Sequence, residues 1–126
     1  MPTVQNYNRG LISNFAGSAS IPANSIILLI ELGIFVNQAS NFLEVSTSVG
    51  VLTDSETGAL VTINVNMDGN PVGTTGTVFI DTSNSVITYN IVLTDVSIGH
   101  HVIQILADSG GYSLNGLATA QATVYG

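Results

Sequence analysis

The stretch ALVTINVNM, residues 59–67, decides the fold class. Its odd-numbered positions from Val61 to Met67 are apolar, and the positions between them are threonine or asparagine. A period of two predicts a β-strand with one face in a core and the other face in water. Asp68-Gly69-Asn70 follows the stretch and predicts a tight hairpin turn, because glycine and asparagine tolerate positive φ.

The same pattern extends outward in both directions along the chain. Valine, isoleucine and threonine dominate, and turn residues return every eight to fourteen positions, which is typical of a sandwich or a barrel. We expect about eight strands, over residues 11–21, 25–37, 42–53, 59–67, 71–80, 85–94, 100–107 and 112–125. With short loops and no internal repeat, this predicts an all-β chain folded as a single antiparallel β-sandwich.

The first 20 residues differ from the rest. Residues 1–10 are polar and aperiodic, and residues 11–21 alternate only weakly. We therefore expect an extended N-terminal arm over residues 1–20, in front of a sandwich domain over residues 21–126. The arm is either a frayed tail or a segment that docks on a neighbouring subunit by adding a strand to its edge.

Charge excludes some partners. The 126 residues contain a single cation, Arg9, against eight acidic residues, which gives a net charge of -7. Nucleic-acid binding requires lysine and arginine to neutralise phosphates, and anionic membranes also attract basic segments. We therefore expect no nucleic-acid partner and no membrane partner. The chain has no cysteine and hence no disulfide.

The predicted surface has few charges. Charged residues make up 7% of the chain, whereas about 25% is usual. Either a skin of serine, threonine and asparagine covers the domain, or much of its surface is buried against copies of itself. The absence of lysine, a common guard of exposed sheet edges, favours self-association.

Residues 25–37, SIILLIELGIFVN, supply a candidate interface. A strand that is apolar on both faces is expected to be buried on both faces, and a partner subunit would provide the second cover. The predicted interface residues on this strand are Ile27, Leu29, Leu32, Ile34 and Val36.

No arrangement of residues indicates catalysis. His100 and His101, considered with Asp95 or Asp108, are adjacent and so point to opposite faces of a strand, where they cannot easily share a metal ion. We expect one to be packed and the other to be exposed. The loop acids Asp54 and Glu56, with Asp68, lack the spacing of a calcium loop. There is no nucleophile motif and no glycine-rich phosphate loop, so we expect no enzyme activity, no catalytic or metal residues and no cofactor.

A binding role is the alternative to self-assembly. Such a module would recognise a receptor or a carbohydrate through its loops, and sugar rings commonly stack on exposed aromatic side chains. The candidates outside the clearest strand cores are Tyr7, Tyr112 and Tyr125.

Two turns and a histidine carry a family resemblance. The matching positions are Asp68, Gly69, Pro71, Val72 and Gly73, then Asp95, Gly99 and His101. This pattern, over residues 20–126, resembles trimeric jelly-roll heads of the tumour-necrosis-factor and complement type. Such heads lie at the tips of collagen-like spore-surface proteins and on phage fibres. The pattern resembles bacterial immunoglobulin-like repeats more weakly. The first resemblance implies a jelly-roll topology and a homotrimer.

The combined expectation is a non-enzymatic structural subunit. It would self-assemble, and the arm would attach it to neighbouring structural proteins. Met1 is followed by polar residues rather than by the basic and apolar regions of a secretory signal, so we expect synthesis in a cytoplasm. The expected location is the surface of a spore, virion or fibre assembled there.

Overall fold

A computed structural model describes residues 4–21, 26–52, 59–76, 78–80, 85–108 and 112–126. For residues 10–21, 27, 52, 59, 78, 85, 108 and 112–117 it describes the backbone alone. None of the described residues belongs to a helix long and apolar enough to cross a membrane.

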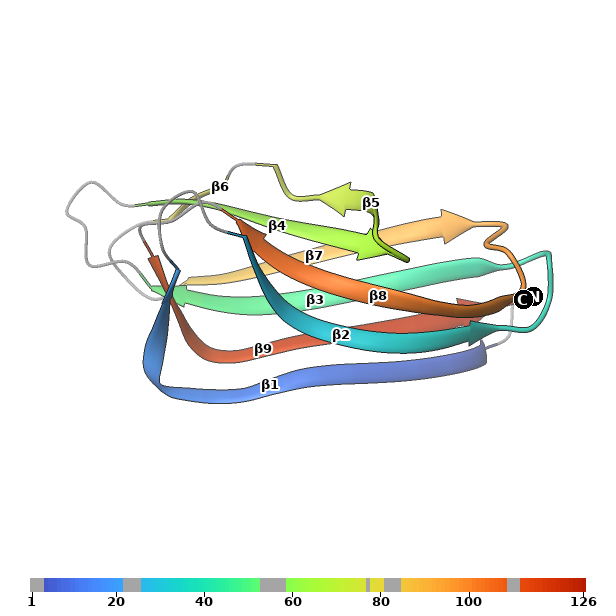
Figure 1. The fold of residues 1–126 in the computed structure, drawn as a ribbon, viewed down its shortest axis with the longest axis horizontal. Helices are drawn as coiled ribbons and strands as arrows, with labels where there is room; N and C mark the ends of the chain where they lie inside the picture. The colour runs from blue at the N-terminus through green and yellow to red at the C-terminus, as the bar shows by residue number, and fades with distance from the viewer. Residues whose placement is uncertain (1–3, 22–25, 53–58, 77, 81–84, 109–111) are drawn as a thin grey trace.

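The described residues form nine strands (Figure 1). These are β1 (Val4–Ile21), β2 (Ile26–Val36), β3 (Phe42–Leu52), β4 (Ala59–Met67), β5 (Asn70–Thr74), β6 (Val78–Ile80), β7 (Ser85–Thr94), β8 (Gly99–Asp108) and β9 (Tyr112–Tyr125). The sequence predicted six of these strands, β2, β3, β4, β7, β8 and β9, to within one residue at each end.

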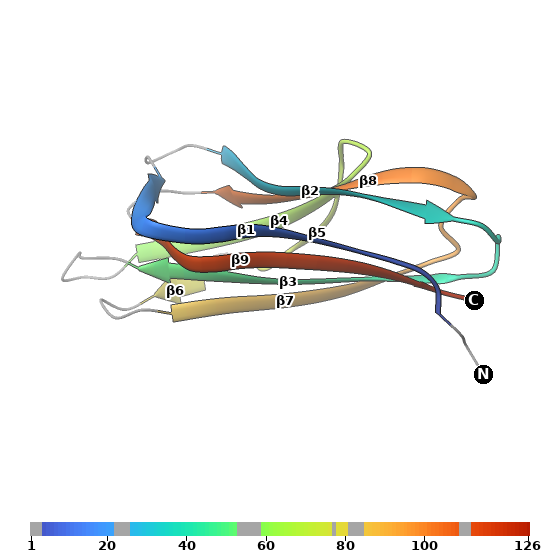
Figure 2. The same cartoon turned by 90° about the horizontal axis from the view of Figure 1, so that it is seen from below.

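The strands make two antiparallel sheets that lie face to face (Figure 2). The first sheet has the order β1-β9-β3-β7, and the second has the order β2-β8-β4-β5, with β6 also paired to β4. The pairing is therefore nested: β1 with β9, β2 with β8, β3 with β7, and β4 with β5 and β6. A long hairpin whose successive pairs alternate between two sheets is a jelly roll, as expected.

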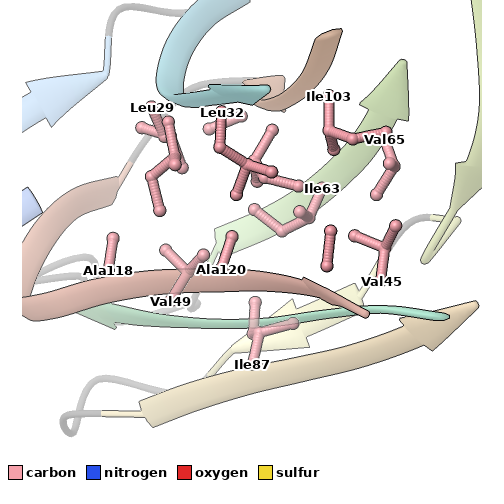
Figure 3. Packing of buried hydrophobic residues seen from close by; sticks show 14 of the residues in the cluster. Leu29, Leu32, Val45, Val49, Ile63, Val65, Ile87, Ile103, Ala118 and Ala120 are labelled. Carbon is pink, nitrogen blue, oxygen red and sulfur yellow. The ribbon is translucent and has the colours of Figure 1, made fainter. Parts of the chain in front are cut away.

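The core lies between the sheets and is formed by alternate residues of each strand. Figure 3 shows Leu29, Leu32 and Ile63 of the second sheet facing Val49 and Ala118 of the first. Small alanines on β9, Ala118 and Ala120, leave room for the larger leucine side chains of β2, so the two layers interlock. Among the described residues, every buried side-chain nitrogen or oxygen atom has a hydrogen-bond partner.

Strand β2 differs from its expected role. A β-bulge between Leu28 and Ile30 interrupts its pairing with β8, so that Leu29 and Ile30 both point into the core. Beyond the bulge the inward positions are the even-numbered ones. The apparent two-sided apolar pattern is thus partly a change of phase within one strand.

The expected N-terminal arm is a strand of the domain itself. Residues 4–21 pair antiparallel with β9 along the edge of the first sheet. Asn6 and Asn8 occupy inward positions of this edge strand, and their side-chain amides donate to the carbonyl oxygens of Phe35 (2.9 Å) and Gly33 (2.6 Å) on β2. These bonds join the neighbouring edges of the two sheets.

The strand expected over residues 71–80 is split into β5 and β6. Gly76 has a φ of 66°, a left-handed conformation that ends the ladder. The side-chain hydroxyl of Thr75 accepts a hydrogen bond from the backbone N–H of Ile63 at 3.1 Å, in place of a strand carbonyl. Along one edge, β4 is therefore paired with two short strands, β5 and β6.

Candidate functional site

The outer face of the first sheet carries a polar groove. The strand register places one row of side chains across all four strands, Arg9, Gln121, Ser46 and Asn90. The adjacent row contains Thr119, Ser48 and Thr88. These residues line a hollow of about 500 Å³, which we call the groove.

Side-chain length explains why this face is hollowed. The central strands β9 and β3 supply short hydroxyl side chains, Thr119, Ser46 and Ser48. Longer side chains, Arg9 and Gln121 toward one edge and Asn90 toward the other, rise around them. Strands about 4.8 Å apart make the four-strand row about 14 Å long. Small-ligand sites commonly have volumes of about 300–1,000 Å³, so the groove has a suitable size.

An exposed aromatic side chain borders the groove. Tyr7 lies one row along β1 from Arg9, is 49% exposed, and donates its hydroxyl hydrogen to Oε1 of Gln121 at 3.1 Å. Tyr125 lies on the same face, paired with Phe42 of β3. Two of the three tyrosines named from the sequence therefore share this face, whereas the side chain of Tyr112 lies outside the described residues.

The outer face of the second sheet is apolar at one end. Ile26 (66% exposed), Leu28 (48%), Leu60 (53%) and Phe79 (63%) lie there, where β2 and β4 begin. Leu60 pairs directly with Phe79, and Leu28 pairs with Leu106 of β8. We call Ile26, Leu28, Leu60 and Phe79 the apolar patch. Such a group of exposed side chains is typical of an interaction surface.

The interface residues named from the sequence lie elsewhere. Leu29, Leu32, Ile34 and Val36 are buried in the core of their own chain. Because they expose almost no surface, they have little left for a second subunit to cover. The side chain of Ile27 lies outside the described residues. The exposed apolar residues of this strand at its start are Ile26 and Leu28, and the bulge at Leu29 changes which positions point outward after them.

One histidine is packed and the other exposed, as expected. Nδ1 of the buried His101 lies 2.6 Å from Oδ2 of Asp68, and its Nε2 lies 2.7 Å from the carbonyl oxygen of Ser97. Burial lowers the pKa of His101, but the bonds to Asp68 and Ser97 outweigh it and raise the pKa overall. His100 is exposed. The partner is Asp68 rather than Asp95, because the hairpin turn and β8 meet at this end of the sandwich.

The residues that carried the family resemblance shape the turns here. Asp68 and Gly69 have φ values of 53° and 85°, as the two central residues of the hairpin between β4 and β5. The Asp68 carboxylate accepts the backbone N–H of Val102 at 2.9 Å in addition to its contact with His101. The backbone N–H of Asp95 donates to the carbonyl oxygen of Asn41. These roles are architectural.

No group of three or more acidic or histidine residues that could hold a metal ion occurs within the described part of the chain. Asp54 and Glu56 lie outside it, and Asp68 is engaged with His101.

Sequence reasoning missed the groove. Its residues are polar positions of alternating strands, which look like ordinary solvated faces when each strand is considered alone. Arg9 stood out as the single cation of the chain. That was the one available signal, and it did not reveal which residues surround it.

Solved structures share the fold. Particles derived from infectious bursal virus match with a TM-score of 0.60 and 14% identity over 98% of this chain and 36% of theirs. The PRD1 vertex protein matches with a TM-score of 0.52 and 15% identity over 96% of this chain and 97% of its own. A CBM36-1 domain of a xylanase from the hindgut metagenome of Trinervitermes trinervoides matches with a TM-score of 0.52 and 13% identity over 92% and 96%.

The chain spans 13% of latent PorU from Porphyromonas gingivalis, which it matches with a TM-score of 0.54. No protein-family model and no curated protein sequence matches the chain. At these identities the likeness concerns the fold. The chain is therefore a jelly-roll β-sandwich, similar in structure to virion proteins and to a carbohydrate-binding module.

Proposed function

We propose that this protein is a non-enzymatic structural subunit that self-assembles through the apolar patch. The observation that carries the proposal is the exposure of Ile26, Leu28, Leu60 and Phe79 on one outer face. Fully burying a leucine, isoleucine or phenylalanine side chain contributes about 1.5–3 kcal/mol. A second copy is the proposed occupant, because a surface with few charged side chains loses little hydration of charged groups when it is buried against another copy.

The proposed assembly is a trimer on the surface of a virion, spore or fibre. The trimer and the spore or fibre setting come from the resemblance to trimeric jelly-roll heads. The fold shared with the PRD1 vertex protein and with the infectious bursal virus particles supports the virion setting. The expected attachment to neighbouring structural proteins through residues 1–20 would leave β1 in its own sheet, because β1 is already paired with β9. A neighbouring protein would therefore pair with the outer edge of β1.

Light scattering after size-exclusion chromatography tests the proposal. The wild-type chain should behave as a trimer at micromolar concentration, and the double variant Leu60→Asp/Phe79→Asp should behave as a monomer. The control is Val86→Asp, which places a charge at a 70% exposed valine on the other sheet and should stay assembled. A monomeric wild-type chain would contradict self-assembly. A control that dissociates as the double variant does would contradict the role of the patch.

A second candidate function is carbohydrate binding. The groove favours it, because hydroxyl and amide side chains lie beside an exposed tyrosine ring. The shared fold with the CBM36-1 domain is consistent with this role. A glycan array, run with and without calcium, tests it. The wild-type chain should bind at least one glycan, and Tyr7→Ala should lose that binding. An array without hits would contradict this function.

A further inference from the structure

We propose that the groove binds an acidic saccharide, with the sugar carboxylate on the guanidinium of Arg9. This inference rests on the second candidate function and adds the charge class of the ligand. It concerns the outer face of the first sheet, and so it is independent of the apolar patch.

The position of Arg9 is the first observation. The single cation of the chain lies in the groove wall, on the edge strand β1. Among the described residues the ion pair present is that of His101 and Asp68, so the guanidinium is not neutralised by a described acidic side chain. Guanidinium groups match carboxylates with two parallel hydrogen bonds. Arg9 is therefore positioned to receive an anion.

The neutral lining indicates the rest of the ligand. Around Arg9 the groove presents four hydroxyl side chains, Ser46, Ser48, Thr88 and Thr119, and two carboxamides, Asn90 and Gln121. Such groups both donate and accept hydrogen bonds, as sugar hydroxyls do. A phosphate monoester carries a charge of about -1.5 to -2 and would meet a single cation in a chain of net charge -7. Each carboxylate of an acidic saccharide carries a single charge, so one of them matches that cation, whereas a phosphate monoester concentrates its charge on one group.

Tyr7 completes the arrangement. Its hydroxyl donates to Oε1 of Gln121, which orients the carboxamide and leaves the two N–H groups of Nε2 as the donors of that side chain. The half-exposed ring supplies an apolar surface next to the polar lining. A pyranose, with polar edges and apolar faces, suits both surfaces.

Glu44 provides an internal check. It lies on the same face, paired with Thr123 and two positions along β3 from Ser46. Its carboxylate opposes an anionic ligand in the groove but has little effect on a neutral one, because their charge interaction is absent. The inference therefore predicts opposite effects for removing the charge of Arg9 and removing the charge of Glu44.

Isothermal titration with two tetrasaccharides tests the inference. The probes are a hyaluronan tetrasaccharide, which carries carboxylates, and the neutral tetraacetylchitotetraose. The wild-type chain should bind hyaluronan at least tenfold more tightly, and raising the salt concentration should reduce the difference. Arg9→Gln should remove the preference, Arg9→Lys should keep part of it, and Glu44→Gln should strengthen hyaluronan binding several-fold. Chitotetraose binding should change little in all three variants.

The outcomes distinguish binding of acidic saccharides from carbohydrate binding in general. Equal binding of both sugars that is insensitive to Arg9→Gln would overturn the acidic-saccharide inference and leave carbohydrate binding standing. Binding of neither sugar would overturn the inference, and the glycan array then decides whether the second candidate function falls with it. Tighter binding of a sulfated heparin tetrasaccharide than of hyaluronan would also overturn the assignment of a carboxylate. Thermal unfolding of each variant confirms that the domain is folded.

Discussion

Nδ1 of His101 lies 2.6 Å from Oδ2 of Asp68, while Nε2 of the same ring lies 2.7 Å from the carbonyl oxygen of Ser97. A carbonyl oxygen only accepts hydrogen bonds, so Nε2 carries a hydrogen. The bond from His101 and the backbone N–H of Val102 hold the pKa of Asp68 below its ordinary value, so its carboxylate is ionised near neutral pH. This arrangement has both ring nitrogens as donors and so favours the protonated form of His101, whose pKa is raised, and the ring ties the β4–β5 turn to the β7–β8 loop.

This pair should make folding stability depend on pH. The pKa of His101 is raised above 6.5 on folding, so its contribution is complete below pH 6.5 and is lost as the pH rises through the folded-state pKa. The pKa of Asp68 is lowered below 3.8, so its contribution is present above pH 3.8 and is lost as the pH falls through the folded-state pKa. The melting temperature should therefore fall as the pH is raised from 6 toward 9.

Two variants test whether His101 causes this dependence of folding stability on pH. His101→Gln should remove the alkaline decrease and cost about 1–2 kcal/mol at pH 6, because Asp68 is partly exposed and water replaces part of the lost interaction. His100→Gln changes the exposed neighbour and should retain the decrease. A melting temperature of the wild-type chain that stays constant from pH 6 to 9 would contradict the charged state of His101.

Asn41 should be sensitive to a change of a single atom. Its buried amide nitrogen donates to the carbonyl oxygens of Val96 (2.8 Å) and Gln38 (2.7 Å), and its Oδ1 accepts the N–H of Val96 at 3.0 Å. Asn41→Asp would place an oxygen against those carbonyls and should cost about 2–3 kcal/mol in urea unfolding. Asn90→Ala on the exposed face should cost less than about 0.5 kcal/mol. Equal costs would show that the Asn41 bonds contribute nothing specific.

Neighbouring positions on β2 should respond differently. Ile34 is 2% exposed and Phe35 is 48% exposed, on opposite faces of the strand. Ile34→Ala should cost about 2–5 kcal/mol because it leaves a cavity in the core. Phe35→Ala should cost about 1 kcal/mol or less. Urea unfolding of both variants checks the assignment. A larger cost for Phe35→Ala would mean that Phe35, and not Ile34, faces the core.

The asparagines of β1 should hold the sheet edges together. Asn6→Ala and Asn8→Ala each remove a side-chain bond to a β2 carbonyl and should cost about 0.5–1.5 kcal/mol. Hydrogen exchange of the backbone amides of β1 should be faster in both variants than in Asn90→Ala. Unchanged exchange rates would mean that these bonds do not contribute to the stability of the edge.

Deleting residues 1–20 tests whether this segment is a strand of the domain or an arm that only docks on neighbours. In the structure the deletion removes the partner of β9 along one whole edge of the first sheet. The truncated chain should lose cooperative thermal unfolding, or aggregate through the newly exposed edge. An arm that only docks on neighbours would leave the melting temperature unchanged, and circular dichroism distinguishes the two results.

The local signals of the sequence predicted most of the fold. The alternation in residues 59–67 placed β4, and Asp68-Gly69 placed the hairpin, because strand periodicity and turn conformations are properties of a few consecutive residues. These local signals did not predict the features that depend on contacts between segments far apart in the chain. Residues 4–10 have no alternation of their own, yet they form part of β1 because β9 presents a ladder for them to pair with. The bulge at Leu29 likewise arises from pairing with β8.

The sequence by itself determined an all-β sandwich, its turns, the near absence of charge and the adjacency of two histidines on opposite faces. Only the tertiary structure decided which polar positions share a row. Arg9, Gln121, Ser46 and Asn90 come from four strands and meet through strand register. Register depends on pairing between segments far apart in the chain. A one-residue shift would turn each of these side chains to the other face of the sheet.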